Sequence, residues 1–361
     1  MVESTHLVDL VQSRIENFVA SRDSIVSSIS PDLTDFVEFS RQFLSGGKRF
    51  RAQFCYWGWR SIAPADSDLS SIVSAAAALE IFHAAALVHD DIIDNSDTRR
   101  GAPSAHKLFE GLHSSSGWAG NSGEFGRASA ILLGDLMLGW SDELLDDGLV
   151  EVPDTRAARA ARVEFNRMRT EVTAGQYLDI LEERAWLTQP ASELLARAHR
   201  VIVFKSAKYS VQAPLVIGAA LAGASAEQLA ALCTVGLPLG IAFQLRDDLL
   251  GVFGDATVTG KPSGDDLREG KRTVLIAVAR DNASDAVRNL IDEYLGDPEL
   301  DTERISRLQQ AILASGAVEQ VEALIAQNVA EARAALTAAP IGPEAKAALE
   351  ALTETVTQRT F

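Results

Sequence analysis

The sequence predicts an all-α protein, a single domain of packed helices that spans residues 1–361. Apolar residues recur at steps of three and four along most of the chain, as they do on the buried side of a helix. No long run alternates apolar and polar residues as a strand would. With 47% hydrophobic and 23% charged residues over 361 positions, the chain is globular and long enough for a large core.

The first predicted helix is N-terminal, where one apolar stripe covers residues 7–19. A second stripe covers residues 318–336, and a break containing Pro and Gly at 340–343 separates it from a last helix that extends to Val356. Short loops between successive helices are typical of such a bundle.

Two uncharged stretches, 209–226 and 228–245, are about as long as a membrane span. Both are rich in Ala, Gly, Ser and Gln, and each contains a proline. We therefore predict buried core helices here and no transmembrane segment.

Residues 111–126 are biased in composition, since nine of these sixteen residues are Gly or Ser. Such a composition predicts a loop. Because helical patterns continue on both sides, we interpret the loop as an insertion within the single domain.

The formal net charge is −17, with 50 Asp and Glu against 33 Lys and Arg. A field of this sign repels nucleic acid and anionic membrane surfaces, so an anionic ligand would need a local basic cluster or a bound divalent metal. The two cysteines are too few for a disulfide framework, and the N-terminal residues include acids and no cleavable apolar core. These features predict a cytoplasmic protein with no nucleic-acid partner.

The first acidic cluster, Asp90, Asp91 and Asp94, stands at the end of an apolar helical stretch. Positions 90 and 94 share a helix face and 91 lies beside them, so the three carboxylates would repel one another without a cation. Mg²⁺ takes oxygen ligands from one or two carboxylates and completes its shell with water and phosphate. A solvent-facing acidic patch is the alternative for this pattern taken alone.

A second acidic cluster, Asp247 and Asp248, follows the uncharged stretch 228–245. Basic residues stand in short, separate groups, which suit one diphosphate bridged through metals between the acidic clusters and a second diphosphate bound directly. These groups are Lys48, Arg49 and Arg51; Arg99 and Arg100; Lys205 and Lys208; and Lys261, Lys271 and Arg272.

The chain resembles the trans-type isoprenyl diphosphate synthases, also called polyprenyl synthetases, and most of all the bacterial geranylgeranyl diphosphate synthases. The matching motifs follow the family's order between residues 43 and 273. They are GGKRFR, EIFHAAALVHDDIIDNSDTRRG, VFKSAKYS, GIAFQLRDDLLGVFGD and GKPSGDDLREGKRT.

The resemblance implies the isoprenoid synthase fold, a helical bundle around a central cavity, with about two or three Mg²⁺ ions per active site. It places Asp90, Asp91 and Asp94 on Mg²⁺ and the allylic diphosphate, with Asp247 binding metal and Asp248 supporting it. The metal ligands would be Asp90, Asp94 and Asp247. The implied contacts of the allylic diphosphate are Arg99, Lys205, Gln244 and Lys261, with Lys205 also catalytic, and those of isopentenyl diphosphate are Lys48, Arg51, His83 and Arg100.

His83 lies seven residues before Asp90, two helical turns away on roughly the same face, which favours a role in binding over core packing. We interpret His89 as structural because it points elsewhere on the helix. Gln176 and Asp179 match polar positions of a family helix that faces the cavity.

One motif departs from the family pattern, since the second acidic cluster usually reads DDxxD and here reads DDLLG, with Gly251 in the last position. Mg²⁺ tolerates several waters in its shell, so activity should survive. If the missing carboxylate weakens metal binding, Gly251→Asp should lower the Mg²⁺ concentration needed for half-maximal rate.

The implied reaction is head-to-tail transfer of a prenyl group from an allylic diphosphate to isopentenyl diphosphate. The growing tail would extend from Asp90 back along the same helix, past the methyl-sized Ala85 and Ala86 to Phe82. We therefore predict geranylgeranyl diphosphate as the main product, with farnesyl diphosphate or a longer polyprenyl diphosphate as the alternatives.

Two other functions compete with this one. A class I terpene cyclase shares the fold and the first acidic cluster, but it has no second diphosphate for Lys48, Arg51 and Arg100 to bind. A non-catalytic subunit of a heteromeric synthase would not need an intact DDIID motif with a complete basic set. The resemblance also implies a homodimer.

Overall fold

The computed structural model describes residues 2–254, 263–297 and 299–358, and its fold is all-α, as predicted. The described residues also include one short antiparallel hairpin, β1 (Thr98–Arg99) with β2 (Ala102–Pro103). Strands of two residues are too short to show an alternating pattern. The chain divides into two compact units, and the prediction of a single domain stays a prediction.

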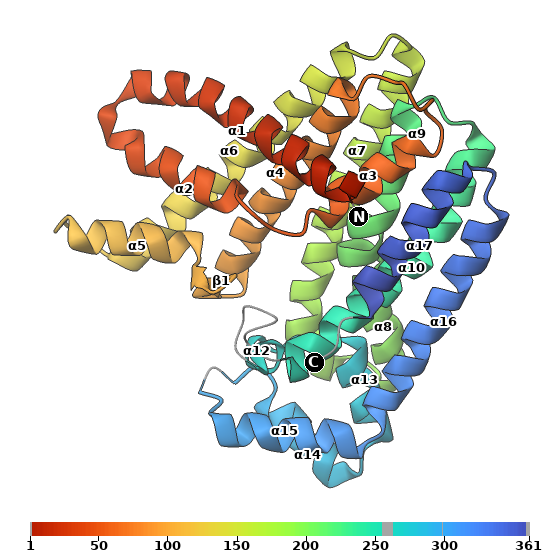
Figure 1. Ribbon diagram of the computed structural model, residues 1–361. Helices are drawn as coiled ribbons and strands as arrows, with labels where there is room; N and C mark the ends of the chain where they lie inside the picture. The colour runs from red at the N-terminus through yellow and green to blue at the C-terminus, as the bar shows by residue number, and fades with distance from the viewer. Residues whose placement is uncertain (1, 255–262, 298, 359–361) are drawn as a thin grey trace. The chain divides into compact units, whose positions relative to one another are not determined.

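Unit 1 comprises the residues up to Arg162 together with Ile217–Ala224. Its central helix is α4 (Ser70–Ile93), which packs against α1, α3 and α6 (Figure 1). The other elements are α1 (Val2–Ile29), η1 (Pro31–Leu33), α2 (Thr34–Leu44), α3 (Phe50–Arg60), α5 (Ala105–Ser115), α6 (Ser122–Val150) and parts of α7 (Thr155–Ala185) and α9 (Ala213–Leu221).

Small residues bring α4 and α6 close together. Ala75, Ala76, Ala77 and Ala78 are all almost fully buried. The Ser141 hydroxyl of α6 donates a hydrogen bond of 2.7 Å to the Ala78 carbonyl of α4. This close packing fixes the helix whose end carries the first acidic cluster.

Unit 2 comprises residues 163–216 and 225–361. Its long helix is α10 (Ala226–Phe253), alongside which α16 (Ala317–Ala338) and α17 (Pro343–Thr357) run (Figure 1). The other elements are η2 (Trp186–Thr188), η3 (Ala191–Glu193), α8 (Leu194–Val201), the π-helix η4 (Ile202–Gln212), α12 (Asp265–Glu269), α13 (Val274–Asn282), α14 (Asp285–Tyr294) and α15 (Thr302–Ala314).

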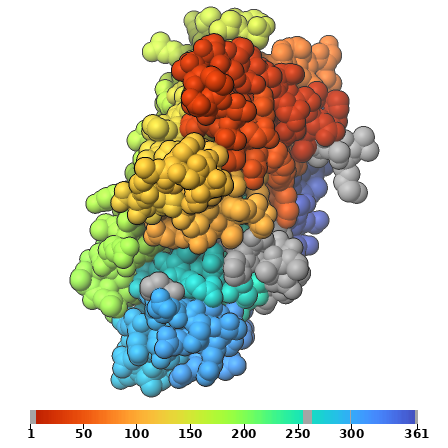
Figure 2. Space-filling model, turned by 90° about the vertical axis from the view of Figure 1, so that its left-hand side faces the viewer, coloured from red at the N-terminus to blue at the C-terminus, as the bar shows by residue number. Residues whose placement is uncertain are grey.

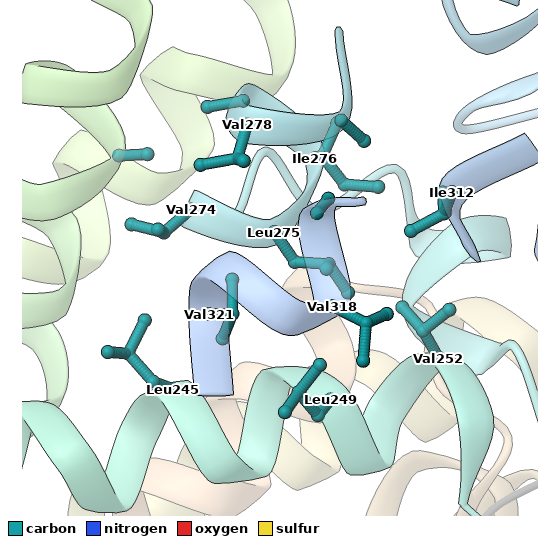
Figure 3. Packing of buried hydrophobic residues seen from close by; sticks show 14 of the residues in the cluster. Leu245, Leu249, Val252, Val274, Leu275, Ile276, Val278, Ile312, Val318 and Val321 are labelled. Carbon is teal, nitrogen blue, oxygen red and sulfur yellow. The ribbon is translucent and has the colours of Figure 1, made fainter. Parts of the chain in front are cut away.

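The core of unit 2 lies between α10, α13, α15 and α16 (Figure 3). Leu245, Leu249 and Val252 recur at steps of four and three on α10, so they share the face that packs against Leu275 and Val318. The acidic residues of α10 are therefore left on its other faces.

The predicted terminal helices are confirmed as α1, α16 and α17. The stretch 228–245 lies within α10, which Ser225 and Gln228 begin with a reciprocal capping box. The stretch 209–226 is helical as far as Leu221, as η4 up to Gln212 and as α9 directly after it, and it ends in a turn in which Gly223 has a φ of +79°.

The prediction of a loop over 111–126 is wrong for most of its length, because α5 continues to Ser115 and α6 begins at Ser122. The side chains of His113, Trp118 and Phe125 pack against one another and close the turn between these helices. Gly126 is buried where α6 meets α5, so this glycine serves packing and not a loop. Figure 2 shows this segment, in yellow, at the surface of unit 1.

Two helices among the described residues, α4 and α10, are long and apolar enough to cross a membrane, with mean hydropathies of 1.8 and 1.6. The structure buries 78% of this window in α4 and 50% in α10. Buried core helices also meet these criteria of length and mean hydropathy. Of the two helices, the sequence pattern had indicated only the stretch 228–245, within α10.

Candidate active site

The end of α4 presents a partly exposed stripe in unit 1. His83, Leu87 and Asp90 lie along it at steps of four and three, and Asp94 follows directly after the helix. Asp91 is turned inward and only 1% exposed. The structure therefore leaves two carboxylates of the first acidic cluster on one side and buries the third.

Asp91 is paired with Arg99, whose Nε donates a hydrogen bond of 2.9 Å to Asp91 Oδ1 and whose Nη2 contacts the same oxygen. Arg99 comes from β1, and the hairpin turns at Arg100 and Gly101, where φ is +54° and +76°. Two successive positive φ values are those of a tight hairpin turn. The turn presents Arg100 at its tip, so the two arginines point to different partners.

Arg100 faces the loop before α3, where its Nη1 donates a hydrogen bond of 3.2 Å to the Ser45 carbonyl. A cavity of about 200 Å³ lies here within unit 1. It is lined by Gln42, Phe43, Ser45, Ala84, Leu87, Arg99, Arg100, Ala102 and Pro103. The lining thus includes both arginines of the hairpin and two residues of α4, Ala84 and Leu87.

Arg49, which the sequence grouped with the ligand-binding cations, is an anchor of the same loop. It is 5% exposed and donates to the Gln12 side chain at 2.6 Å and to Glu80 Oε2 at 3.3 Å. Glu80 also accepts a hydrogen bond of 3.0 Å from the Ala52 backbone N–H. The pair holds the start of α3 against α4, and Lys48 beside it remains exposed.

His83 lies in a positive field. Although the His83 side chain is partly exposed, desolvation of its imidazole lowers the pKa well below the usual value, and the positive charges of Arg51, Arg100, Arg99 and Arg49 lower it further. His83 is therefore neutral at pH 7 and offers one N–H donor in place of a charge.

Two further expectations concern α4. His89 packs on Gly134 of α6, where any Cβ would overlap the imidazole, and its Nε2 lies 3.3 Å from the Ile131 carbonyl. This agrees with the structural role predicted for His89. Of the residues predicted to set chain length, Phe82 and Ala85 are 5% and 0% exposed, and Ala86 is partly exposed one turn before Asp90.

In unit 2, glycines hold η4 in place. A Cβ on Gly175 of α7 would overlap the backbone of Lys205, and one on Gly236 of α10 would lie 2.7 Å from Gln212 Cα. η4 is thus packed backbone to backbone against both neighbours. A π-helix within a helical segment is frequently a functional site, and this one carries Lys205.

Asp179 of α7 forms ion pairs with two lysines. The family resemblance had matched this residue only to a polar position. Its Oδ2 lies 2.5 Å from Lys205 Nζ and 3.7 Å from Lys271 Nζ. The Lys271 ammonium is also 3.6 Å from Glu269 Oε2. Asp179 is 7% exposed, so this network is nearly buried. Sequence reasoning had left Lys271 without a role, although the GKR motif marked it as basic.

In the last third of α10, Gln244, Asp247 and Gly251 are partly exposed and lie on one stripe. Asp248 is 4% exposed and accepts a hydrogen bond of 2.8 Å from Gln244 Nε2. Burial raises the pKa of Asp248 well above the usual value, Gln244 opposes this rise, and the charges of Asp266, Asp247 and Asp179 add to it. Gln244, expected on the allylic diphosphate, thus supports Asp248 in this structure.

The predicted effect of Gly251→Asp on the Mg²⁺ requirement stays a prediction, and Gly251 has no positive φ that would bar a side chain. Gly251 lies inside α10, and a Cβ there would overlap the Asp266 carboxylate and lie 2.9 Å from its Oδ1. A new carboxylate would meet an existing one, so the Asp266 side chain would have to move to admit it.

The residues fit Mg²⁺ only with additional ligands. Among the described residues, no three His, Cys, Asp or Glu side chains gather closely enough to hold a metal ion. Asp248 Oδ2 is buried and has no hydrogen-bond partner in the part of the chain that the structure describes. An ion whose shell is completed by water and phosphate suits this arrangement. Lys261, and Asp255 of the GD motif, lie outside the described residues.

Comparisons with known proteins agree with these motifs. A solved structure of geranylgeranyl pyrophosphate synthase from Corynebacterium glutamicum, complexed with isoprenyl diphosphate and magnesium, is 39% identical, with a TM-score of 0.92 and coverage of 98% of this chain and 99% of that chain. A geranylfarnesyl diphosphate synthase from Aeropyrum pernix is 31% identical over 87% of this chain and 91% of its own length. A geranylgeranyl diphosphate synthase from Methanosarcina mazei is 33% identical over 75% of this chain and 74% of its own length.

The sequence pattern of the family described as polyprenyl synthetase matches residues 35–312, and the chain belongs to this family. It is a polyprenyl diphosphate synthase, a prenyltransferase of isoprenoid biosynthesis that condenses isopentenyl diphosphate. Its helices form the isoprenoid synthase fold.

Proposed function

We propose that this protein condenses an allylic diphosphate with isopentenyl diphosphate, head to tail and with Mg²⁺, to make geranylgeranyl diphosphate. The observation that carries the product length is the small, partly exposed Ala86 one turn before Asp90, with Phe82 one turn further. Its relatives include both a geranylgeranyl and a geranylfarnesyl diphosphate synthase, so the choice rests on these residues of α4.

The residues of unit 1 divide between two substrates. Asp90 and Asp94 would hold Mg²⁺, which supplies neutralisation of the charge that develops on the leaving diphosphate. Arg100 and the exposed Lys48 would bind isopentenyl diphosphate with Arg51. His83, which is neutral, would donate a hydrogen bond to it without adding charge.

The residues of unit 2 act on the leaving group. Asp247 would hold Mg²⁺, and Lys205, oriented by Asp179, would donate to an oxygen of the allylic diphosphate as its C–O bond breaks. The double bond of isopentenyl diphosphate then attacks the allylic cation, and the departing pyrophosphate takes the proton that is lost. Apolar helix surface shields the cation from water.

Product analysis tests this proposal. The purified chain, given Mg²⁺, farnesyl diphosphate and isopentenyl diphosphate, should form mainly the twenty-carbon product. Ala86→Phe should shorten the main product to fifteen carbons or fewer when a shorter starter is used, and Phe82→Ala should lengthen it. An unchanged distribution in both active variants would contradict the length assignment.

We also propose that the protein is a homodimer and acts in a reducing cytoplasm. Ile131 and Leu132 of α6 are 44% and 62% exposed, which leaves an apolar patch for a second copy of the chain. Cys55 and Cys233 are free thiols, as a reducing compartment requires. Light scattering should give the mass of a dimer for the wild type and of a monomer for Leu132→Glu, and a monomeric wild type would refute the dimer.

A further inference from the structure

Asp266 lies against the one position where the second acidic cluster lacks a carboxylate. It belongs to α12, fifteen residues after Gly251 in the sequence, and its Oδ2 stands where a Cβ of residue 251 would be. Gly251 shares a stripe of α10 with Asp247, one turn earlier. A carboxylate at this place is therefore next to the cluster, although it comes from another helix.

The fold holds α12 firmly in this position. Leu267, the residue after Asp266, is fully buried in the core of unit 2. Gly264 and Gly270 bound the helix with φ of +74° and +79°, and Gly270 packs so closely that a Cβ would lie 2.9 Å from Gly296 Cα. The packing of α12 therefore fixes the position from which the Asp266 side chain contacts Gly251.

A second observation, on Asp248, points to a cation as the ligand of this cluster. Asp248 Oδ2 is buried and, within the described ranges, has no hydrogen-bond partner. Asp266 and Asp247 are the acidic neighbours that act most strongly on Asp248, after burial and the Gln244 hydrogen bond. Two further carboxylates close to a buried, unsatisfied carboxylate oxygen are unfavourable, and a bound cation would offset this cost.

We propose that Asp266 supplies the third carboxylate of the second acidic cluster, in the place that a side chain at position 251 would occupy. This inference rests on the proposed function, in which Asp247 and Asp248 serve Mg²⁺. Mg²⁺ keeps several waters, so Asp266 can act by accepting hydrogen bonds from them as well as by direct contact. Asp266 is then a positioning residue for the metal.

The chain offers a matched control in Asp265, the preceding residue of the same short helix. Its Oδ1 lies 3.9 Å from Arg268 Nη1, within α12. Asp265→Asn and Asp266→Asn remove the same charge from the first turn of α12 with almost no change in volume. Only the second removes the carboxylate that stands against Gly251.

Metal binding is measured with Mn²⁺ and inorganic pyrophosphate, from the paramagnetic resonance signal of unbound Mn²⁺. Asp266→Asn should weaken Mn²⁺ binding by about tenfold, as loss of an outer-shell partner does, and Asp265→Asn should stay within about twofold. Circular dichroism checks the fold of each variant. Wild-type affinity in a folded Asp266→Asn would overturn the proposal, as would an equal loss in Asp265→Asn.

A relocation experiment tests the place itself. Asp266→Ala should bind Mn²⁺ weakly, and Gly251→Asp combined with Asp266→Ala should regain most of the affinity, because the carboxylate then enters the vacated space from α10. A folded double variant that binds no better than Asp266→Ala would contradict the shared position. If the double variant does not fold, Asp266→Asn alone decides.

The outcome is separable from that of the proposed function. Binding of Mn²⁺ and pyrophosphate requires no turnover. A wild type that binds both but forms no prenyl product would refute the proposed function and leave the role of Asp266 to the variants.

Discussion

The two acidic clusters differ in what surrounds their buried carboxylate. In unit 1, the buried Asp91 is neutralised by Arg99, and other arginines make the field at His83 positive. In unit 2, the buried Asp248 receives an amide hydrogen bond from Gln244, and the charges of Asp266, Asp247 and Asp179 oppose its ionisation. Arg99 therefore compensates the buried carboxylate of the first cluster, whereas nearby carboxylates add to the unfavourable burial of the second.

The largest effect should be common to both clusters, since each has a partly exposed carboxylate for metal. Asp90→Asn and Asp247→Asn should each lower kcat by about a hundredfold or more, about 2.7 kcal/mol, because each removes a ligand and no core contact. Steady-state rates and circular dichroism measure this. Retention of more than about a tenth of the wild-type rate, about 1.4 kcal/mol, would reject the metal assignment at that position.

Replacing each buried carboxylate by its amide should change the free energy of unfolding differently in the two units. Asp91→Asn leaves Arg99 uncompensated and should lower the free energy of unfolding by about 3 kcal/mol, whereas Asp248→Asn removes a repelled charge and should lower it by less than about 0.5 kcal/mol. Urea unfolding with a metal chelator present measures both. Equal losses would show that the surroundings do not distinguish these residues.

The positive field in unit 1 should appear in the pH dependence of stability. The pKa of His83 is lowered on folding, so between its folded pKa and about 6.5 the unfolded chain binds more protons, and stability falls as the pH falls. Stability should therefore fall between pH 7 and pH 5, and His83→Gln should remove the part of this fall that comes from His83. Unfolding of both proteins at these two pH values tests this, and identical pH dependence would be the contrary result.

The smallest effect should come from the lysines of unit 2. Asp179→Asn leaves Lys205 and Lys271 in place but less well oriented, so KM for the allylic diphosphate should rise by about fivefold to tenfold, up to about 1.4 kcal/mol. KM for isopentenyl diphosphate should not change. Lys205→Ala serves as the reference for complete loss of the contact, and a rise in both KM values would point to a general loss of structure.

The local pattern of the sequence was sufficient for the helices and the motifs. The stripe at residues 7–19 and that at 318–336 lie in helices, and Asp90 and Asp247 stand at partly exposed positions near helix ends. The spacing of three and four residues determines these features, because it depends only on the geometry of one helix. The Gly and Ser content of residues 111–126 led to a wrong prediction of a loop, because local composition does not show contacts between helices. A glycine such as Gly126 can serve such a contact as well as a loop.

Contacts between segments far apart in the chain were beyond the sequence. It identified Arg49 as basic, but the buried partner Glu80 lies 31 residues away and decides that Arg49 anchors a loop. It identified Gly251 as a missing carboxylate, but the packing of α12 decides that Asp266 stands at that place. The sequence by itself determined which residues share a helix face, since that follows from local periodicity. Only the tertiary structure decided which charges are buried and paired, because that depends on which helices pack together.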